Sequence, residues 1–238
     1  MEEKYESIGK KYNGEKAIIS LTSWKARIDT VGKTLFSLLV KCPGFHIVLV
    51  LSEEEFPQKE KELPDDLMLF IKKKFIEILW VYKNYKSLKK VLFTMDKYRD
   101  VPVISADDDC VYKFNYAKDF YDIWVNHKDY FICYWCAYNE KYKCYNTSGY
   151  ATLHPPYIYG DCLKYLNNDK LIEYNQDDLI YLALRIKKGL KNVICLNKPY
   201  EKIVCSHDEI KPLHDTYRKD KYLQKNTIND VINFIVNN

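Results

Sequence analysis

Three adjacent aspartates, Asp107, Asp108 and Asp109, follow a short apolar run at residues 101–104 in the stretch ISADDDCVY. Adjacent carboxylates repel one another, so they need a counter-charge or one of them must bind a proton. A divalent cation meets this need, because Mg²⁺ and Mn²⁺ bind carboxylate oxygens together with water and diphosphate. In an extended segment Asp107 and Asp109 would point to one side and Asp108 elsewhere. The stretch therefore predicts a metal site, with an exposed acidic turn as the alternative.

A second acidic pair, Asp177 and Asp178, opens a predicted helix later in the chain. Aspartates at a helix start often cap backbone N–H groups and oppose the helix dipole. In a catalytic site, one of the two would cap the helix while the other acts as a general base. The sequence leaves both interpretations open.

The elements that would position these acids alternate between strand and helix in the first half of the chain. Apolar runs predict strands at residues 16–22, 46–51, 76–81 and 101–105. Helical spacing of apolar residues predicts helices at 31–40, at 65–74, and after Ser87, a candidate N-cap. This alternation is typical of an α/β fold with a mostly parallel sheet and helices on both faces. Ligands bind at the carboxyl ends of such strands, which is where the three aspartates fall.

The second half of the chain is less regular. The sequence predicts a helix at 116–126, a strand at 130–134, loops and short strands over 137–160, a helix at 177–188 ended by Gly189, a strand at 192–196 and a last helix at 227–236. The 238 residues contain no internal repeat and no low-complexity linker. We therefore expect one domain with a less regular second half.

Composition restricts the class of protein and its partners. A hydrophobic content of 47% fits a globular protein rather than a disordered one. The net charge of +4 is mildly basic and does not require a nucleic-acid partner. Lysine clusters at 72–74, 86–90 and 187–188 fit solvated helix faces, or an attraction to anionic lipid headgroups or phosphorylated ligands.

The chain has no apparent secretory segment and no long apolar run, which predicts a cytoplasmic protein, with peripheral contact at the inner face of the membrane as a further expectation. Its eight cysteines are then expected to be mostly free thiols. Cys133 and Cys136, with Cys144, have half of a zinc-site spacing. No second CxxC or HxxxH accompanies them, so the sequence favours a buried strand here.

Four stretches carry a resemblance to a known family. They are ISLTSWKARI (19–28), IVLVLSEEEFP (47–57), YKSLKKVLFTMDKY (85–98) leading into the aspartates, and QDDLIYLAL (176–184). In this order and approximate spacing, the chain resembles bacterial glycosyltransferases of the GT-A fold that build surface polysaccharides. The resemblance implies a Rossmann-like sheet in a single domain over residues 1–238. About 16–112 would form the nucleotide-sugar half, and about 113–238 the acceptor half and C-terminal helix.

The resemblance also implies which residues bind the donor, a nucleoside-diphosphate sugar for which UDP is favoured over GDP. The aspartates match the family's DxD motif, in which Asp107 and Asp108 would contact the donor and Asp109, with Asp107, would bind Mn²⁺ or Mg²⁺. The remaining donor-binding candidates are Thr22, Ser23, Arg27 and Lys90, with Lys86 or Lys89 as alternatives to Lys90.

On the acceptor side, the resemblance implies that Asp178, beside Asp177, deprotonates a hydroxyl of a glycan or lipid-linked glycan. A base opposite the leaving group favours inversion at the sugar. The sequence contains neither the motif of the family's processive synthases nor an apparent membrane helix. We therefore expect a hexosyltransferase that adds a single sugar. His207 and His214 are further candidates for the metal site.

Two other functions fit parts of the sequence. Residues 107–111 also match DxDx[TV], the signature of Mg²⁺-dependent haloacid-dehalogenase-type phosphatases, in which the first Asp is the nucleophile. That signature normally follows the first strand, whereas here it follows the fourth predicted strand. A non-catalytic nucleotide-sugar-binding module is the other alternative, and it would need the three aspartates but not Asp178.

Overall fold

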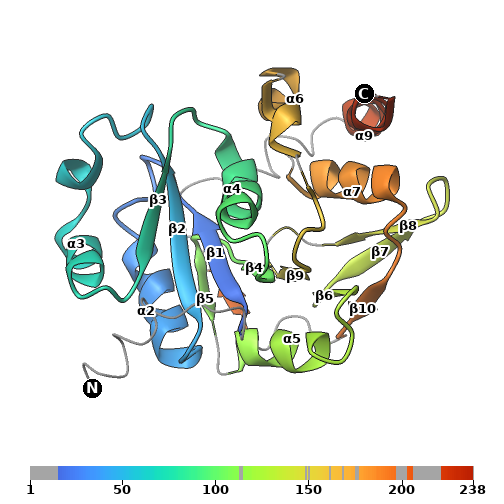
Figure 1. Cartoon of the computed structure of the whole chain (residues 1–238). Coiled ribbons are helices and arrows are strands. Elements are labelled where there is room, and N and C mark those ends of the chain that lie inside the picture. The colour runs from blue at the N-terminus through green and yellow to red at the C-terminus, as the bar shows by residue number, and fades with distance from the viewer. Residues whose placement is uncertain are drawn as a thin grey trace.

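The computed structural model describes residues 16–112, 115–147, 149, 151–160, 162–167, 169–174, 177–196, 203–205 and 221–237. Its main feature is a seven-stranded sheet with the strand order β10-β6-β9-β4-β1-β2-β3 (Figure 1). The strands of this sheet are β1 (Ile18–Thr22), β2 (His46–Ser52), β3 (Glu77–Val81), β4 (Val103–Ser105), β6 (Phe131–Cys133), β9 (Thr152–His154) and β10 (Val193–Cys195).

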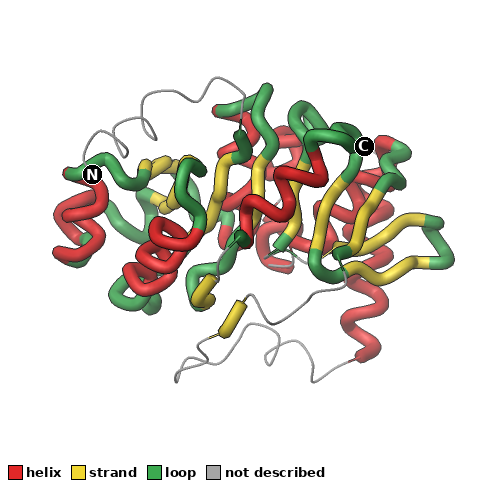
Figure 2. Tube along the Cα trace, turned by 90° about the horizontal axis from the view of Figure 1, so that it is seen from below, coloured by secondary structure: helices red, strands yellow, loops and turns green. Residues whose placement is uncertain are grey.

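Helices and two small antiparallel strand pairs complete the described part of the chain. The helices are α2 (Val31–Lys41), α3 (Asp65–Lys72), α4 (Lys89–Lys97), α5 (Tyr116–Trp124), α6 (Asp169–Tyr174), α7 (Asp177–Lys188) and α9 (Lys221–Asn237). Short 3₁₀ turns lie at Lys59–Glu62, Lys86–Leu88 and Cys162–Asn167. The strand pairs are β5 (Cys110–Tyr112) with β11 (Ile203–Cys205), and β7 (Cys136–Asn139) with β8 (Cys144–Thr147). The β7–β8 hairpin extends beyond the sheet at one end (Figure 2).

The sheet is mostly parallel, as the sequence predicts. Only β9 among its strands runs against its neighbours, β4 and β6. The other six strands are parallel within their pairs, and β4 and β6 share one direction because both oppose β9. The carboxyl ends of these six strands therefore lie along one edge, which we call the carboxyl edge.

Strand residues alternate between two layers of helices. Ile19 and Leu21 of β1 belong to the core that contains apolar residues of α2, α3 and α5. On the opposite face, Val103 and Phe131 pack with α4, α7 and α9. In Figure 1, α2 and α5 lie below the sheet and α4 and α7 above it. The prediction of helices on both faces is confirmed.

Most predicted elements agree with the structure to within a few residues. Ser87 is an exception, because it lies in the 3₁₀ turn and α4 begins after it, with Leu88 at the N-cap. Gly189 follows α7 with φ of +68°, a left-handed conformation that glycine adopts without steric cost and that ends the helix as predicted. None of the described helices combines the length and the apolar character needed to span a bilayer.

The edge strand β3 carries a polar cluster whose contribution to stability can be measured. Burial opposes ionisation of Glu77, but hydrogen bonds from His46, Tyr98 and Lys97 outweigh it and lower the carboxyl pKa to about 2. A depressed pKa stabilises the fold above the unfolded value of about 4.3, and this contribution disappears as the pH falls toward the folded value.

We therefore expect Glu77→Gln to lower the free energy of unfolding by about 1–2 kcal/mol at neutral pH, since hydrogen bonds to a charged group are lost. The difference should shrink as the pH falls from about 4.3. Urea unfolding monitored by circular dichroism, at neutral pH and at a series of lower pH values, measures the destabilisation and its pH dependence. Glu140→Gln, at an exposed position, is the control and should leave stability unchanged. A pH-independent effect of Glu77→Gln would contradict this assignment.

Candidate active site

Close packing of α4 on β1 brings Lys90 to the carboxyl edge. The Ser20 hydroxyl on β1 donates to the Lys90 carbonyl, and its Oγ lies 2.7 Å from the Thr94 Oγ1. These side chains are small, so the helix can approach the strand closely. The Lys90 side chain is itself buried, and its ammonium Nζ lies 2.8 Å from Asp107 Oδ1 and 2.9 Å from Asp177 Oδ2. Lys90 therefore bridges the two acidic segments that the sequence singles out.

The three aspartates lie in a turn between β4 and β5, not in an extended strand. β4 ends at Ser105, so the expected alternation of side chains does not apply to residues 107–109. The Asp107 backbone N–H donates to the Tyr112 hydroxyl at 2.8 Å. Thr34 Oγ1 donates to the Asp108 carbonyl at 2.8 Å, which ties the turn to α2.

Residues from the loop after β1 hold two of the three carboxylates. Asp108 is buried and accepts a hydrogen bond from Ser23 Oγ at 2.6 Å. Arg27 Nη1 lies 2.9 Å from Asp108 Oδ1 and 3.0 Å from Asp109 Oδ2. Asp108 thus points inward, and Asp107 and Asp109 do not share one direction as strand alternation would have predicted. Asp109 shares a cation with Asp108, whereas Asp107 turns toward Lys90.

The carboxylates are crowded enough to disturb one another's ionisation. Burial and the neighbouring charge of Asp109 raise the pKa of both Asp107 and Asp108, although Lys90 and Arg27 oppose the increase. Burial also opposes the charge of Lys90, but Asp107 and Asp177 outweigh it and raise the lysine pKa. Lys90 is therefore cationic at neutral pH.

The two carboxyl groups of the acid pair at the start of α7 have pKa values that are shifted in opposite directions. Burial opposes the charge of Asp177, yet the attraction and hydrogen bond of Lys90 outweigh it and lower the Asp177 pKa. Burial and the charge of Asp177 raise the pKa of half-buried Asp178 well above its usual range. Such a split between neighbouring carboxyl groups is characteristic of acid–base sites.

Gly149 packs directly against this pair. A Cβ atom added to Gly149 would lie 2.5 Å from Asp178 Oδ1 and 2.8 Å from Asp177 Oδ2. Both separations are too short for carbon and oxygen, so a larger residue would displace the carboxylates. Only glycine leaves the pair in its present position.

For an acid–base role of this pair, we expect Gly149→Ala to reduce the rate of the catalysed reaction by about 100-fold, because small displacements of catalytic groups have effects of this size. Circular dichroism should show an unchanged fold. Gly32→Ala is the matched control, since its added Cβ would also meet a carboxyl group, that of the exposed Asp66, on a different part of the chain. Wild-type turnover in Gly149→Ala would show that the acid pair tolerates displacement.

The acidic residues outnumber the cations at this edge. Five acidic side chains gather here, those of Asp107, Asp108, Asp109, Asp177 and Asp178, and Arg27 and Lys90 form ion pairs with four of them. Lys89 does not join them, because its ammonium lies 3.2 Å from Glu55 Oε2 and 3.0 Å from Asn84 Oδ1. The excess of negative charge fits a divalent cation.

The available carboxylate ligands also suit Mg²⁺ or Mn²⁺, ions that are usually bound together with the phosphates of a substrate. Such ions take one or two protein carboxylates and complete their shell with water and phosphate oxygens. In agreement with this, the described acidic side chains form no group of three with ligand atoms within 4.8 Å of one another. Asp107 and Asp109 are the partly exposed members of the turn, with 37% and 21% of their side chains accessible. These two residues could hold the ion.

Other predicted residues lie apart from the acids or outside the described part of the chain. The Thr22 hydroxyl donates to the Val50 carbonyl at 2.7 Å and so points to β2 rather than to the aspartates. His207 and His214 lie outside the described residues. The contacts made by Thr34, Tyr112 and Gly149 were not predicted, since only the three-dimensional arrangement brings these residues to the acids.

Comparisons with known proteins give structural similarities only. No protein-family model and no curated protein sequence matches the chain. The chain is similar to the crystal structure of GalNAc-T7 with UDP, GalNAc and Mn²⁺, with a TM-score of 0.41 and 13% identity over 62% of this chain and 26% of that one. It is also similar to the apo-form glycosyltransferase GlyE of Streptococcus pneumoniae TIGR4, with a TM-score of 0.38 and 14% identity over 75% of this chain and 45% of that one. The chain spans less than half of either structure, and similarity at this level assigns no activity to it.

Proposed function

We propose that the chain is a metal-dependent glycosyltransferase of the GT-A type that transfers a sugar from a nucleoside-diphosphate sugar to a hydroxyl acceptor. One observation carries the proposal. Lys90 Nζ lies within 2.9 Å of carboxylates from both the aspartate turn and the start of α7. Two acidic motifs that are distant in the sequence therefore meet at the edge of the sheet where ligands bind.

The aspartate turn would form the donor side of the site. Asp107 and Asp109 would hold Mn²⁺ or Mg²⁺, which offsets the charge that develops on the departing nucleoside diphosphate. Arg27 and Lys90 are cations next to these carboxylates, and both are suited to bind diphosphate oxygens. Asp108 would position Arg27, since its own carboxylate is buried and bonded to Ser23. UDP is the favoured nucleotide on the basis of the sequence resemblance.

The start of α7 would form the acceptor side of the site. In this division of the chain, residues of about 16–112 form the donor half and residues of about 113–238 the acceptor half. Asp178 would remove the proton of the acceptor hydroxyl, and Asp177 would stay ionised to hold Lys90. A raised pKa makes Asp178 a stronger base once it is deprotonated. This arrangement favours inversion at the transferred sugar. The acceptor would be a glycan or lipid-linked glycan, at the inner face of the membrane.

The experiment incubates the protein with a panel of nucleoside-diphosphate sugars and glycan acceptors, and follows release of the nucleoside diphosphate. We expect release from one donor class that requires Mn²⁺ or Mg²⁺ and stops on addition of EDTA. p-Nitrophenyl phosphate with Mg²⁺ is assayed in parallel. Turnover of this phosphate ester without nucleotide release would favour the phosphatase alternative and contradict the proposal. Donor binding with no transfer to any acceptor, unchanged by Asp178→Asn, would favour a binding module.

A further inference from the structure

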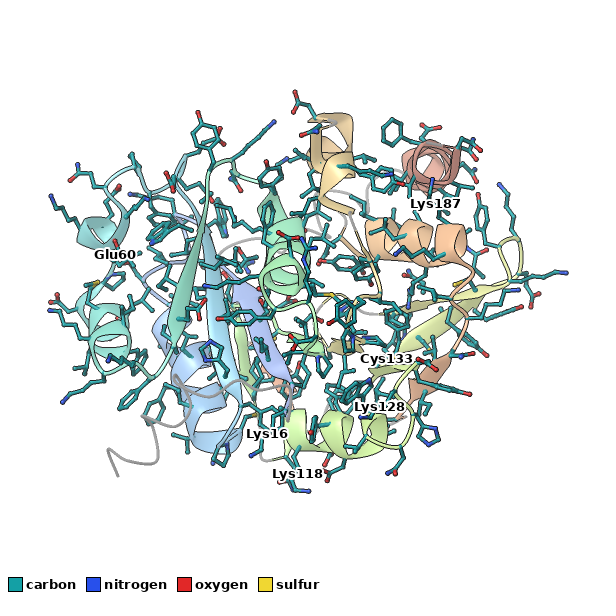
Figure 3. The ribbon with its side chains drawn as sticks, viewed as in Figure 1. Lys16, Glu60, Lys118, Lys128, Cys133 and Lys187 are labelled. Carbon is teal, nitrogen blue, oxygen red and sulfur yellow. The ribbon has the colours of Figure 1, made fainter. Side chains whose placement is uncertain are left out.

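Three cysteine thiols meet at the end of the sheet away from β3. Cys133 ends β6 and Cys195 ends β10, and the two residues are directly opposite in the parallel register. Cys136 begins β7 after a bend in the chain and joins them. All three Sγ atoms lie within 4.8 Å of one another. Figure 3 shows Cys133 in the sheet below α7. We call these residues the cysteine triad.

The spacing of the triad suits a thiophilic metal ion. A zinc–sulfur distance of about 2.3 Å in a tetrahedral site separates two sulfur atoms by about 3.8 Å. The thiols of the triad already lie close to this spacing, so small side-chain rotations would bring them to it. Cys136 and Cys195 are half-buried, which gives an ion a path from solvent. The two paired strands and the bend hold the ligands in place without any ion.

The buried positive charge of Arg185 gives an independent indication of an anionic centre near the triad. Arg185 of α7 is fully buried, yet no carboxylate among the described residues forms an ion pair with it. Its Nη1 donates to Thr147 Oγ1 at 3.2 Å and its Cζ lies 4.9 Å from the centre of the Phe131 ring. Its Nε and Nη2 are buried without a hydrogen-bond partner in the described part of the chain. A buried cation without an anion is costly, so an anionic centre nearby is expected.

The triad is close enough to provide that anion. Thr147, which accepts the hydrogen bond from Arg185, lies directly opposite Cys136 in the β7–β8 pairing. Phe131, whose ring contacts the Arg185 guanidinium, precedes Cys133 by two residues in β6. A divalent ion with three thiolates would carry one net negative charge, which matches the single charge of Arg185.

We infer that Cys133, Cys136 and Cys195 form a binding site for a thiophilic metal ion such as Zn²⁺, with Arg185 as the buried counter-charge. Binding releases the three thiol protons to solvent, and water fills the fourth position. The ion would fix β6, β7 and β10 relative to α7. Asp178 lies on the same helix, about 10 Å from Arg185 along the helix axis. The site is separate from the aspartate turn and does not depend on the proposed function.

The probe is Co²⁺ added to the reduced, full-length protein under anaerobic conditions. We expect binding with a stoichiometry of one ion per chain, with thiolate-to-metal charge-transfer absorption and the intense visible bands of a tetrahedral site. Addition of Zn²⁺ should remove both signals, because Zn²⁺ binds more tightly than Co²⁺. No charge-transfer absorption, with all thiols confirmed as reduced, would overturn the inference.

Matched cysteine variants identify the ligands. Cys195→Ser should abolish the charge-transfer signal or weaken Co²⁺ binding by more than 100-fold, whereas Cys144→Ser should retain wild-type binding. Cys144 is the matched control, since it is a buried cysteine close to Cys136 in sequence that is not part of the triad. Circular dichroism of each variant checks folding. Equal losses in the two variants would overturn the assignment of ligands.

Arg185→Met tests the counter-charge. Methionine keeps an apolar packing volume but removes the positive charge, so we expect Co²⁺ affinity to fall by about 10–100-fold, as for other residues that support metal ligands. The apo protein should be as stable as wild type or more so, because a buried uncompensated charge is removed. Unchanged affinity in Arg185→Met would show that Arg185 does not balance a metal centre.

Discussion

Asp178→Asn is expected to reduce sugar transfer by about 10²–10⁴-fold, the usual contribution of a general base. Asparagine has the shape of the protonated carboxyl group but cannot accept the acceptor's proton. Donor binding should stay at its wild-type level, because Lys90, the cation assigned to the diphosphate, forms its ion pairs with Asp107 and Asp177 rather than with Asp178 among the described residues. Rates of nucleotide release and donor titrations measure the two effects separately.

The pH dependence of the same residue gives a second measurement. Because burial and Asp177 raise the pKa of Asp178, wild-type kcat/KM should increase with pH through a value well above about 3.9, that of an ordinary aspartate. A raised folded pKa stabilises the fold only while the group is protonated, and this contribution is lost as the pH rises through it. Asp178→Asn should therefore match or exceed the wild-type Tm at neutral pH.

Asp122→Asn is the control for this prediction, since Asp122 is an exposed aspartate on α5 whose carboxylate pairs with Lys118 one helical turn away. Its rate and Tm should equal those of wild type. A large fall in the Tm of Asp178→Asn together with unchanged transfer would show that the acid pair only caps α7.

Lys90→Met should destabilise the fold by about 3–5 kcal/mol, the usual cost of leaving one partner of a buried ion pair without its counter-charge. The side chains of Lys90 and Asp177 are only 5% and 10% exposed, so solvent screens the remaining carboxylate little. The variant should also lose donor binding, because Lys90 is the cation that we assign to the diphosphate. Urea unfolding and donor titration are the measurements.

The sign of the pH effect separates this ion pair from simple packing. Asp177 has a lowered pKa, so the pair stabilises the fold above about 3.9 and the contribution is lost as the pH falls through the folded value. The destabilisation by Lys90→Met should therefore be largest at neutral pH and shrink in acid. Combining it with Asp177→Asn should recover part of the stability. Lys33→Met, at an exposed position of α2, should have no effect.

The arrangement of strands and helices was largely predictable from the sequence, because apolar periodicity reports burial directly. The direction of β9 was not, since residues 152–154 form a strand too short to have a clear pattern. The aspartates were located correctly at a strand end. Their orientation was not predictable, because it depends on where β4 stops and on hydrogen bonds to Ser23 and Tyr112.

Most of the site features that the sequence did not predict depend on contacts between residues that are distant in the chain. The sequence could not distinguish Lys90 from Lys89, because adjacent helix residues point in directions about 100° apart and the docking of α4 decides which one faces the acids. The structure pairs Lys90 with Asp107, and Lys89 with Glu55. Likewise, the sequence grouped Cys144 with Cys133 and Cys136. The pairing of β6 with β10 brings Cys195 there instead.

The most direct test of the proposed function is a thermal-shift titration of UDP, GDP and other nucleoside diphosphates with and without Mn²⁺. Free ligand at about 100 times its Kd stabilises a protein by about 2.7 kcal/mol, and each kcal/mol raises the Tm of a chain of this size by about 2–4 °C. We predict such an increase for one nucleotide, only with Mn²⁺ present, and its loss in Asp109→Asn. If no nucleoside diphosphate raises the Tm in the presence of Mn²⁺, the site does not bind the proposed donor and the proposed function is wrong.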